Sequence, residues 1–301
     1  MREKGKRPFE KFRKDESEGK RGEHKEKSFK KFPPKKGGFK PKLGGKGKKR
    51  PVEAEDRNKL PRLNQYIARA GICSRREADE LIATGKVKVN GKVVREMGWR
   101  VHQGDKVTYE GQLLKGERPV YLLLNKPKGF LSTMSDDRGR KTVMQLISSA
   151  CDERIYPVGR LDRETTGLLL FTNDGDLAKN LTHPSSLVKK IYHVYLDKPI
   201  TEEHLDAMNE GVELEDGFMK PDIVNYVMEQ PDGTEFGIQI HSGKNRVVRR
   251  LFEHFGYKVV KLDRVLFANL TKKDLPRGKW RMLQEKEVSM LKVVAGKTKK
   301  R

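Results

Sequence analysis

The chain has 301 residues, and its 66 lysine and arginine residues against 42 aspartate and glutamate residues give a formal net charge of +24. Residues 1–50 alone hold 21 basic and 7 acidic residues. An excess of this size predicts a polyanionic partner, with nucleic acid favoured over an acidic membrane surface. Two cysteines, Cys73 and Cys151, are too few for a disulfide framework, which favours a reducing compartment.

Three further classes of protein are excluded by what the sequence lacks. No cysteine pair or cluster of histidine and cysteine offers a metal site. The longest apolar stretch, near residues 168–171, is far shorter than the ~20 residues of a membrane-spanning helix. The first residues are charged and lack the apolar segment of a secretory signal. We therefore expect a cytoplasmic protein without a metal, a small-molecule cofactor or a membrane partner.

Both ends of the chain are predicted to be basic tails. Residues 1–60 are rich in Lys, Glu, Gly and Pro and have few apolar side chains. Such a segment cannot bury enough apolar surface to offset its chain entropy, so we expect it to be disordered. Residues 295–301 form a shorter basic tail of the same kind. A solvated tail of this charge raises the non-specific affinity for RNA.

Residues 61–110 carry the pattern of a small folded module. Apolar residues at helical spacing predict a first helix over 63–70. Ser74 and Glu77 form a capping box that begins a second helix. Residues 86–94 alternate lysine and valine around an Asn-Gly pair, which predicts a β-hairpin. The candidate RNA-binding residues of this module are Arg62, Arg75, Arg76, Lys86 and Lys88.

This stretch resembles the S-four RNA-binding fold, an αL-type module named after a small-subunit ribosomal protein. The match spans residues 62–109 and is carried by the run Gly-Ile-Cys-Ser-Arg-Arg-Glu-Ala at 71–78. The resemblance implies that the second helix grips structured RNA, with Arg75 and Arg76 on phosphates. Two arginines in a capped first turn oppose the helix dipole, which favours this role over a merely solvated face of an ordinary helical subdomain.

A second domain is predicted over residues 118–291, after a polar linker at 110–118. Its strands and helices alternate irregularly, without regular βαβ units. This order predicts an α+β fold with a mixed, largely antiparallel sheet. The predicted strands lie at 120–124, 192–196 and 236–240, and the predicted helices begin near Thr201 and span 245–255.

The clearest chemical feature is a tight polar loop at residues 159–167, between two apolar segments. Asp162 lies at its tip between Arg160 and Arg163, and a glycine stands at each end. An aspartate in such a loop is more often a turn-capping residue, so the loop alone does not identify a site. The chain has no phosphate-binding Gly-x-x-x-x-Gly-Lys-Ser/Thr loop.

The full string around Asp162 resembles the catalytic loop of the pseudouridine synthases, in the branch that carries an N-terminal S-four domain and modifies ribosomal RNA. Leu-Pro-Arg-Gly-Lys-Trp at 275–280 resembles the large-subunit members more than the small-subunit ones. Val247 departs from the family, because many relatives carry a polar Gln or Glu there, and any hydrogen bond from that side chain is absent. The other matching motifs are Gly-Arg-Leu-Asp at 159–162, Thr-Gly-Leu-Leu-Leu at 166–170, Asn-Lys-Pro-Lys-Gly at 125–129, Lys-Ile-Tyr at 190–192 and Gly-Lys-Asn-Arg-Val-Val-Arg-Arg at 243–250.

The resemblance implies an isomerase that converts uridine to pseudouridine in ribosomal RNA, with the large subunit preferred. The base moves from a C–N bond to a C–C bond on one sugar, so the reaction needs no oxidant, energy donor or metal. Asp162 is the implied nucleophile, and attack on the ribose, attack on the base and deprotonation of the sugar all stay open. Arg249 is the implied partner that keeps Asp162 ionised, and Tyr192 is implied to stack on the uracil.

The target uridine must leave its stack to reach Asp162, at a cost of roughly a few kcal/mol that contacts to the pocket and the RNA backbone offset. The candidate contacts to the RNA backbone in this domain are Arg160, Lys190, Arg246 and Arg250. The expected partner is ribosomal RNA or a pre-ribosomal particle, and the expected state is a monomer.

Two other functions compete with this interpretation. A non-catalytic RNA-binding ribosome assembly factor would use both domains as clamps, but it has no use for a buried carboxylate that faces phosphate. A nuclease would need the clustered carboxylates of metal-dependent cleavage, which the sequence lacks.

Overall fold

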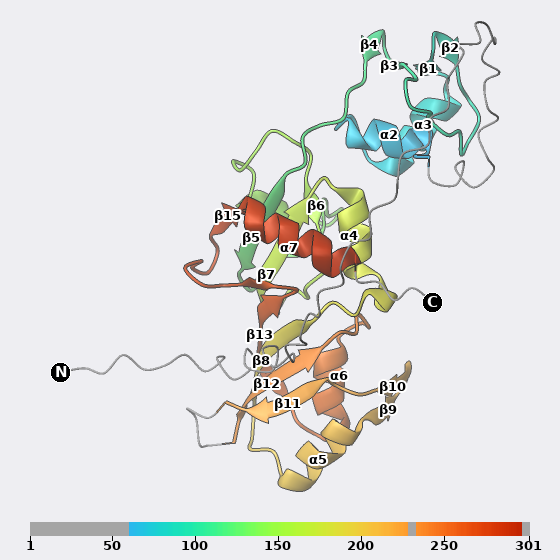
Figure 1. Ribbon diagram of the computed structural model, residues 1–301. Coiled ribbons are helices and arrows are strands. Elements are labelled where there is room, and N and C mark those ends of the chain that lie inside the picture. The colour runs from blue at the N-terminus through green and yellow to red at the C-terminus, as the bar shows by residue number, and fades with distance from the viewer. Residues whose placement is uncertain (1–59, 228–232, 297–301) are drawn as a thin grey trace, which may run out of the picture. The chain divides into compact units, whose positions relative to one another are not determined.

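The computed structural model describes residues 60–227 and 233–296 (Figure 1). Residues 1–59 and 297–301 lie outside the described part, and with them nearly all of both predicted tails. In the described part, no helix is both long enough and apolar enough to cross a membrane.

Residues 61–114 form a small module in which two helices pack on a four-stranded antiparallel sheet (Figure 1). The helices are α2 (Leu63–Arg69) and α3 (Arg75–Ala83). The strands are β1 (Val87–Val89), β2 (Lys92–Val93), β3 (Val107–Tyr109) and β4 (Gln112–Leu113), in the order β2-β1-β3-β4. The module has a hydrophobic core of its own, which includes Leu63, Ile67, Ala78, Ile82, Val87 and Val107.

The predicted capping box at the start of α3 is confirmed. The Ser74 hydroxyl accepts a hydrogen bond from the Glu77 amide, and the Glu77 carboxylate accepts one from the Ser74 amide. These bonds satisfy amide groups that have no partner inside the helix. The first turn is thereby fixed with Arg75 and Arg76 exposed on it.

The predicted hairpin between β1 and β2 is also confirmed. Asn90 and Gly91 join the strands with φ angles of 51° and 80°, the positive values that a two-residue hairpin turn requires. The Asn90 side chain donates a hydrogen bond to Asp105 at 2.8 Å and accepts one from the Lys106 amide at 2.9 Å. The turn sets a register in which Lys88 is exposed between two buried valines.

The predicted linker at 110–118 is wrong in its first part. Glu110 and Gly111, with φ angles of 49° and 83°, join β3 to β4 in a second hairpin. Leu114 follows β4 and is buried in the core of the module. The polar composition concealed this hairpin because both residues of β4 are exposed, which leaves no alternation of apolar and polar side chains.

The second domain is built on one mixed sheet (Figure 1). Its main path has the order β11-β12-β8-β13-β7-β5-β15, while β14 pairs with β13 and β6 pairs with β7. Among the described strands every pair is antiparallel except β7 with β13, so the predicted sheet is confirmed. The strands are β5 (Tyr121–Lys126), β6 (Tyr156–Pro157), β7 (Thr166–Thr172), β8 (Lys190–Leu196), β11 (Ile223–Tyr226), β12 (Glu235–Ile240), β13 (Val259–Phe267), β14 (Leu270–Thr271) and β15 (Trp280–Met282).

Both faces of β5 and β7 are buried, which explains their unbroken apolar sequences. Leu123 and Leu168 face a smaller core that α4 and α7 close. Leu122 and Leu169 face the larger core, which α5, α6 and a 3-10 helix, η2, help to cover. These helices are α4 (Gly175–Thr182), α5 (Glu202–Glu210), α6 (Val247–His254), α7 (Glu285–Gly296) and η2 (Val143–Leu146).

Helix α7 continues past residue 291, the predicted end of the domain. Leu291 and Ala295 are both buried in the smaller core, one helical turn apart. Residues 295 and 296 therefore belong to this helix and not to a tail, because their helical face packs on the sheet.

The two halves of the sheet meet where β7 and β13 run in parallel. In the described residues this ladder has two pairs, Asp263 with Thr166 and Arg264 with Gly167. Gly167 has a φ of 107°, and a Cβ atom there would lie 2.3 Å from the Arg264 carbonyl oxygen. A glycine is therefore required for the backbones of β7 and β13 to approach this closely.

Candidate active site

A cleft of about 660 Å³ lies at this junction. Its walls include the loop between β6 and β7, the first half of β8 and the segment that leads from β12 into α6. Of the described side chains that line it, seven are cationic and two are acidic. The cationic ones are Arg140, Arg160, Arg163, Lys190, Lys244, Arg246 and Arg264, and the acidic ones are Asp136 and Asp162. This balance of charge favours a polyanion.

Asp162 is carried by the loop between β6 and β7, whose backbone is fixed by several hydrogen bonds. The Ser132 hydroxyl donates to the Leu161 carbonyl at 2.9 Å and accepts from the Leu161 amide at 3.2 Å. The Thr165 amide donates to the Asp162 carbonyl at 3.1 Å and closes the turn. The Asp162 side chain lines the cleft and is 35% exposed. The carboxylate is thus held in place and still open to a substrate.

A buried ammonium group lies against the backbone of this loop. Lys126, the last residue of β5, is fully buried, and its Nζ contacts four carbonyl oxygens of described residues. They belong to Pro127 at 3.2 Å, Asp162 at 3.1 Å, Arg163 at 3.3 Å and Thr165 at 2.8 Å. Burial lowers the pKa of Lys126 to about 8, and the negative charge of Asp162 opposes this shift. Lys126 therefore ties the Asp162 loop to the end of β5.

Tyr192 reaches the same cleft from the other half of the sheet. It lies in β8, opposite Ile238 of β12 and Arg264 of β13. The residue is 8% exposed, lines the cleft and contacts the larger core. An aromatic side chain held in this way offers a rigid surface on which a base can stack.

Two arginines at the start of α6 lie in different surroundings near Asp162. Arg246 is exposed, and its Nη1 lies 4.0 Å from Asp162 Oδ2 and its Nη2 3.7 Å from Glu253 Oε1. Arg249, the predicted partner of Asp162, is buried, and its Nη1 donates to the Val259 carbonyl at 2.8 Å. Burial and the charge of Arg246 lower the pKa of Arg249, while the charge of Asp162 raises it. Among the described residues, the ion pair of Asp162 is therefore with Arg246 and not with the predicted partner Arg249.

Lys190, a predicted contact to RNA, is bonded to backbone carbonyl groups. Its Nζ donates to the His241 carbonyl at 2.8 Å and lies 3.3 Å and 3.4 Å from those of Val188 and Ser242. Burial lowers the pKa of Lys190 to about 8. In this arrangement Lys190 joins the start of β8 to the segment that leads into α6.

Lys244 and Arg250 hold a two-stranded hairpin of β9 (Val212–Leu214) and β10 (Gly217–Met219). Arg250 Nη2 donates to the Asp216 carboxylate at 2.8 Å. Lys244 Nζ donates to the carbonyl groups of Asp216 at 2.7 Å and Gly217 at 2.9 Å. The hairpin is thereby attached to the basic motif at 243–250.

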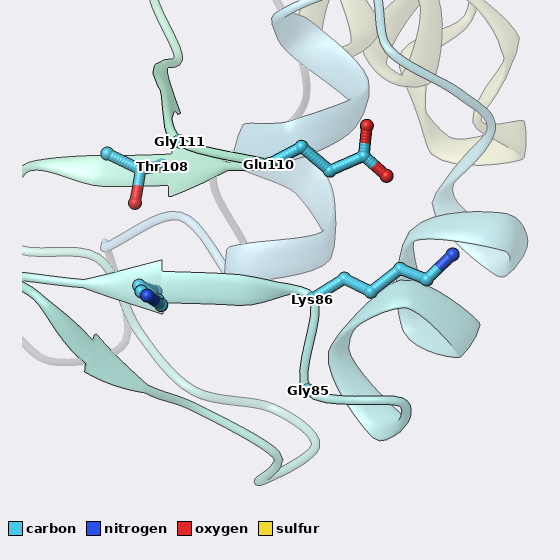
Figure 2. Close-up of a pocket in the computed structure, with 6 residues that line it drawn as sticks. Gly85, Lys86, Thr108, Glu110 and Gly111 are labelled. Carbon is cyan, nitrogen blue, oxygen red and sulfur yellow. The ribbon is translucent and has the colours of Figure 1, made fainter.

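The other predicted RNA contacts are exposed side chains. Arg160 lines the cleft, and the five basic residues named in the first module are all exposed. In that module, Lys86, Lys88, Thr108 and Glu110 line a shallow cavity of about 360 Å³. Figure 2 shows Lys86, which directly precedes β1, and Glu110, which directly follows β3, extending to the same side. Exposed basic groups of this kind suit contacts to phosphate.

Three residues of the site were not predicted from the sequence. Lys126 belongs to a matched motif, but the motif does not indicate what this lysine contacts. Its position directly after a run of apolar residues, at the end of β5, is the one sign that it is buried. No local sequence pattern identifies Ser132, because its hydrogen-bond partner Leu161 lies 29 residues away. Arg264 is buried on the cleft wall, where its Nε donates to the Leu168 carbonyl at 2.8 Å. The described residues contain no group of three or more His, Cys, Asp or Glu side chains that could hold a metal ion.

Two sequence families match this chain. The pattern of the RNA pseudouridylate synthases matches residues 120–254, and that of the S4 domain matches residues 61–107. The ribosomal large subunit pseudouridine synthase B of Bacillus subtilis is 42% identical, over 78% of this chain and 97% of that protein. The dual-specificity RNA pseudouridine synthase RluF of Escherichia coli is 40% identical, over 75% of this chain and 77% of that protein.

A solved structure is also similar. The crystal structure of a pseudouridylate synthase superposes with a TM-score of 0.55 and 31% sequence identity. The match covers 76% of this chain and 99% of that one.

Proposed function

The chain belongs to the RNA pseudouridylate synthase family, and we propose that it converts a specific uridine of large-subunit ribosomal RNA to pseudouridine. The observation that carries the proposal is the meeting of Asp162 and Tyr192, from opposite halves of the sheet, in one strongly cationic cleft. The large subunit as target is supported by the name of the Bacillus subtilis relative and by the motif at 275–280.

In this proposal Asp162 is the carboxylate that reacts with the flipped uridine, as in covalent catalysis by other carboxylates. Its backbone is fixed by Lys126 and Ser132, so little motion is needed to reach the reacting atom. Arg249 supports the negative charge of Asp162 from a buried position, and Arg246 stands on the exposed side, where a phosphate can reach it. Tyr192 stacks on the uracil and retains it while it turns.

The division of labour between the two domains is part of the proposal. Residues 61–110 dock on structured RNA through the exposed arginines of α3, and residues 118–291 carry the reaction. Arg160 and Arg250 contact the RNA backbone near the target. The partner is ribosomal RNA or a pre-ribosomal particle in the cytoplasm, and the protein acts as a monomer.

The proposal is tested by a map of pseudouridines in cellular RNA. Carbodiimide modification with a primer-extension readout is applied to cells with and without the gene, and to cells that express wild type or Asp162→Ala. We expect one site to disappear from large-subunit RNA without the gene, to return with wild type and to stay absent with Asp162→Ala. Transfer RNA is mapped in parallel, so that a substrate outside ribosomal RNA is also detected.

Three other outcomes would contradict the proposal in different ways. A site that returns with Asp162→Ala removes Asp162 from its role as nucleophile. A site lost from small-subunit or transfer RNA alone overturns the choice of substrate. An unchanged map in all RNAs, together with retained RNA binding, would favour the non-catalytic assembly factor.

A further inference from the structure

Asp263 joins several segments beside the Asp162 loop, although it does not line the cleft. It lies in β13 and is 7% exposed. The Thr166 hydroxyl donates to Asp263 Oδ1 at 2.9 Å. The Arg277 guanidinium donates to both carboxylate oxygens, at 2.9 Å and 3.2 Å, and the Lys272 ammonium pairs with the same carboxylate. We call these four residues the Asp263 cluster.

The Asp263 cluster spans the junction between the two halves of the sheet. Asp263 and Thr166 are partners in the parallel ladder of β7 and β13, which has two residue pairs in the described part of the chain. Asp162 lies on the β7 side of this junction, and Tyr192 lies on the β13 side. Because so short a ladder makes few backbone hydrogen bonds, side-chain bonds across it have a large share in fixing the register.

The same cluster is connected to the loop that carries Asp162. Thr166 directly follows Thr165, whose carbonyl accepts the shortest hydrogen bond of Lys126, at 2.8 Å. Arg277 Nη1 also lies 3.4 Å from the Lys126 carbonyl. The guanidinium and the hydroxyl that hold Asp263 are thus both attached to the base of this loop.

We propose that Asp263 is a positioning residue, which acts through Thr166 and Arg277 to set the place of Asp162 relative to Tyr192 and Arg246. The inference rests on the proposed role of Asp162 and extends it to a residue that touches no substrate. A misplacement of about 1 Å at a reacting group costs on the order of 10²-fold in rate. Loosening the cluster therefore lowers the rate of the chemical step and leaves RNA affinity unchanged.

Thr166→Val and Thr166→Ser provide the central test. Valine keeps the shape of threonine and removes the hydroxyl that donates to Asp263, whereas serine keeps the hydroxyl. We expect Thr166→Val to lower the single-turnover rate about tenfold, with the Kd for a target RNA fragment within about twofold of wild type. Thr166→Ser restores most of the rate. Asp263→Asn gives a loss at least as large as that of Thr166→Val.

Arg277→Met and Arg281→Met separate positioning from stability. Arg281 makes a bidentate pair with Glu287 at 2.7 Å, comparable to the pair of Arg277 with Asp263. It lies in β15, and its hydrogen bonds go to Glu287 and the Met282 carbonyl rather than to Asp263 or Lys126. All rates are measured well below the Tm of each variant. We expect both variants to lower the Tm and Arg277→Met alone to lower the rate.

The inference is overturned if Thr166→Val and Asp263→Asn keep the wild-type single-turnover rate. It is also overturned if the Kd for RNA rises while the rate stays unchanged, or if Arg281→Met loses as much rate as Arg277→Met. The single-turnover rate of Asp162→Asn is measured in the same experiment. If that variant is inactive while the variants of the Asp263 cluster are fully active, the positioning role fails and the proposed function stands.

Discussion

The ammonium nitrogen of Lys126 lies 3.1 Å from the carbonyl oxygen of Asp162, so the end of β5 is bonded directly to the backbone of the proposed nucleophile. The side chain of Asp162 faces the cleft, whereas its main chain is held from the buried side. A reactive group on a rigid backbone needs little reorganisation to meet its substrate. This arrangement makes the stability of the loop and the rate of the reaction depend on the hydrogen bonds of one buried amino group.

Lys126→Met is predicted to lower both stability and rate. Methionine keeps the buried volume but removes the Lys126 donor from the carbonyl groups of Asp162 and Thr165, of which the Asp162 carbonyl keeps only the Thr165 amide. We expect a loss of about 2–4 kcal/mol in the free energy of unfolding in urea, and a loss on the order of 10²-fold in single-turnover rate. Lys128→Met is the control, because its ion pair with Glu164 is exposed to solvent and contributes little to stability. Equal effects of the two substitutions would contradict the role of Lys126.

The lowered pKa of Lys126 predicts a rise in stability at alkaline pH. Below pH 8 the amine is protonated in both the folded and the unfolded state, so it contributes no pH dependence. Between pH 8 and about 10.4 the unfolded state binds a proton that the folded state has released, and the free energy of unfolding therefore rises with pH. The lowered pKa of Lys190, also about 8, raises the free energy of unfolding in the same pH range.

Urea titrations of wild type and Lys126→Met at several pH values between 7 and 10.5 measure this effect. We expect the slope of the unfolding free energy against pH to be lower in the variant, by up to about 1.4 kcal/mol per pH unit. Groups that titrate in both proteins cancel in the difference. Identical slopes would show that Lys126 keeps an ordinary pKa in the folded protein.

Substitution of Arg246 is predicted to affect RNA binding, whereas substitution of Arg249 is predicted to affect the reaction rate. Arg246 is exposed on the cleft, so Arg246→Met weakens RNA binding and reduces the slope of log K against log salt by about 1. Arg249 is buried beside the Val259 carbonyl, so Arg249→Met leaves that slope unchanged and lowers the rate. Salt titrations of RNA binding and single-turnover rates check both statements. A changed salt slope in Arg249→Met would place Arg249 among the RNA contacts instead.

Gly167→Ala is predicted to be among the most destabilising single substitutions in the second domain. Its Cβ would lie 2.3 Å from the Arg264 carbonyl oxygen, at a φ of 107° that other residues rarely adopt. The strands β7 and β13 would have to separate, at a cost of roughly 3 kcal/mol or more. Gly116→Ala is the control, because no atom lies within 4 Å of its Cβ position. The Tm of both variants is measured by thermal unfolding. A wild-type Tm in Gly167→Ala would contradict the close approach of β7 to β13 at this residue.

Local signals in the sequence were enough for many of the elements. The Ser74–Glu77 capping box and the Asn90–Gly91 turn are each specified by residues a few positions apart, and both are confirmed. The hairpin through Glu110 was missed because its strands are short and β4 is exposed. Its turn depends on a glutamate with positive φ, which composition does not indicate.

The motifs in the sequence predicted part of the lining of the cleft. Asp162 and Tyr192 were named from the resemblance, and they do line one cleft. The different places of Arg246 and Arg249 follow from where α6 begins, at Val247, which the run of basic residues does not reveal. Apart from the contact of Lys126 with the adjacent Pro127, the side-chain contacts of Lys126 and Asp263 join residues from 9 to 97 positions apart. They therefore depend on tertiary pairings that no local pattern encodes.

The turn of Asn90 and Gly91 also limits the chemical lifetime of the first module. An asparagine before glycine loses ammonia when the next backbone nitrogen attacks its side-chain carbonyl. Here that carbonyl accepts the Lys106 amide and the side-chain nitrogen is bonded to Asp105, so the hairpin must open before the attack. Water then opens the cyclic imide that this attack forms, which leaves a second carboxylate beside Asp105. Prolonged storage at alkaline pH therefore introduces a negative charge into the proposed RNA-binding module at a site that mass spectrometry can follow.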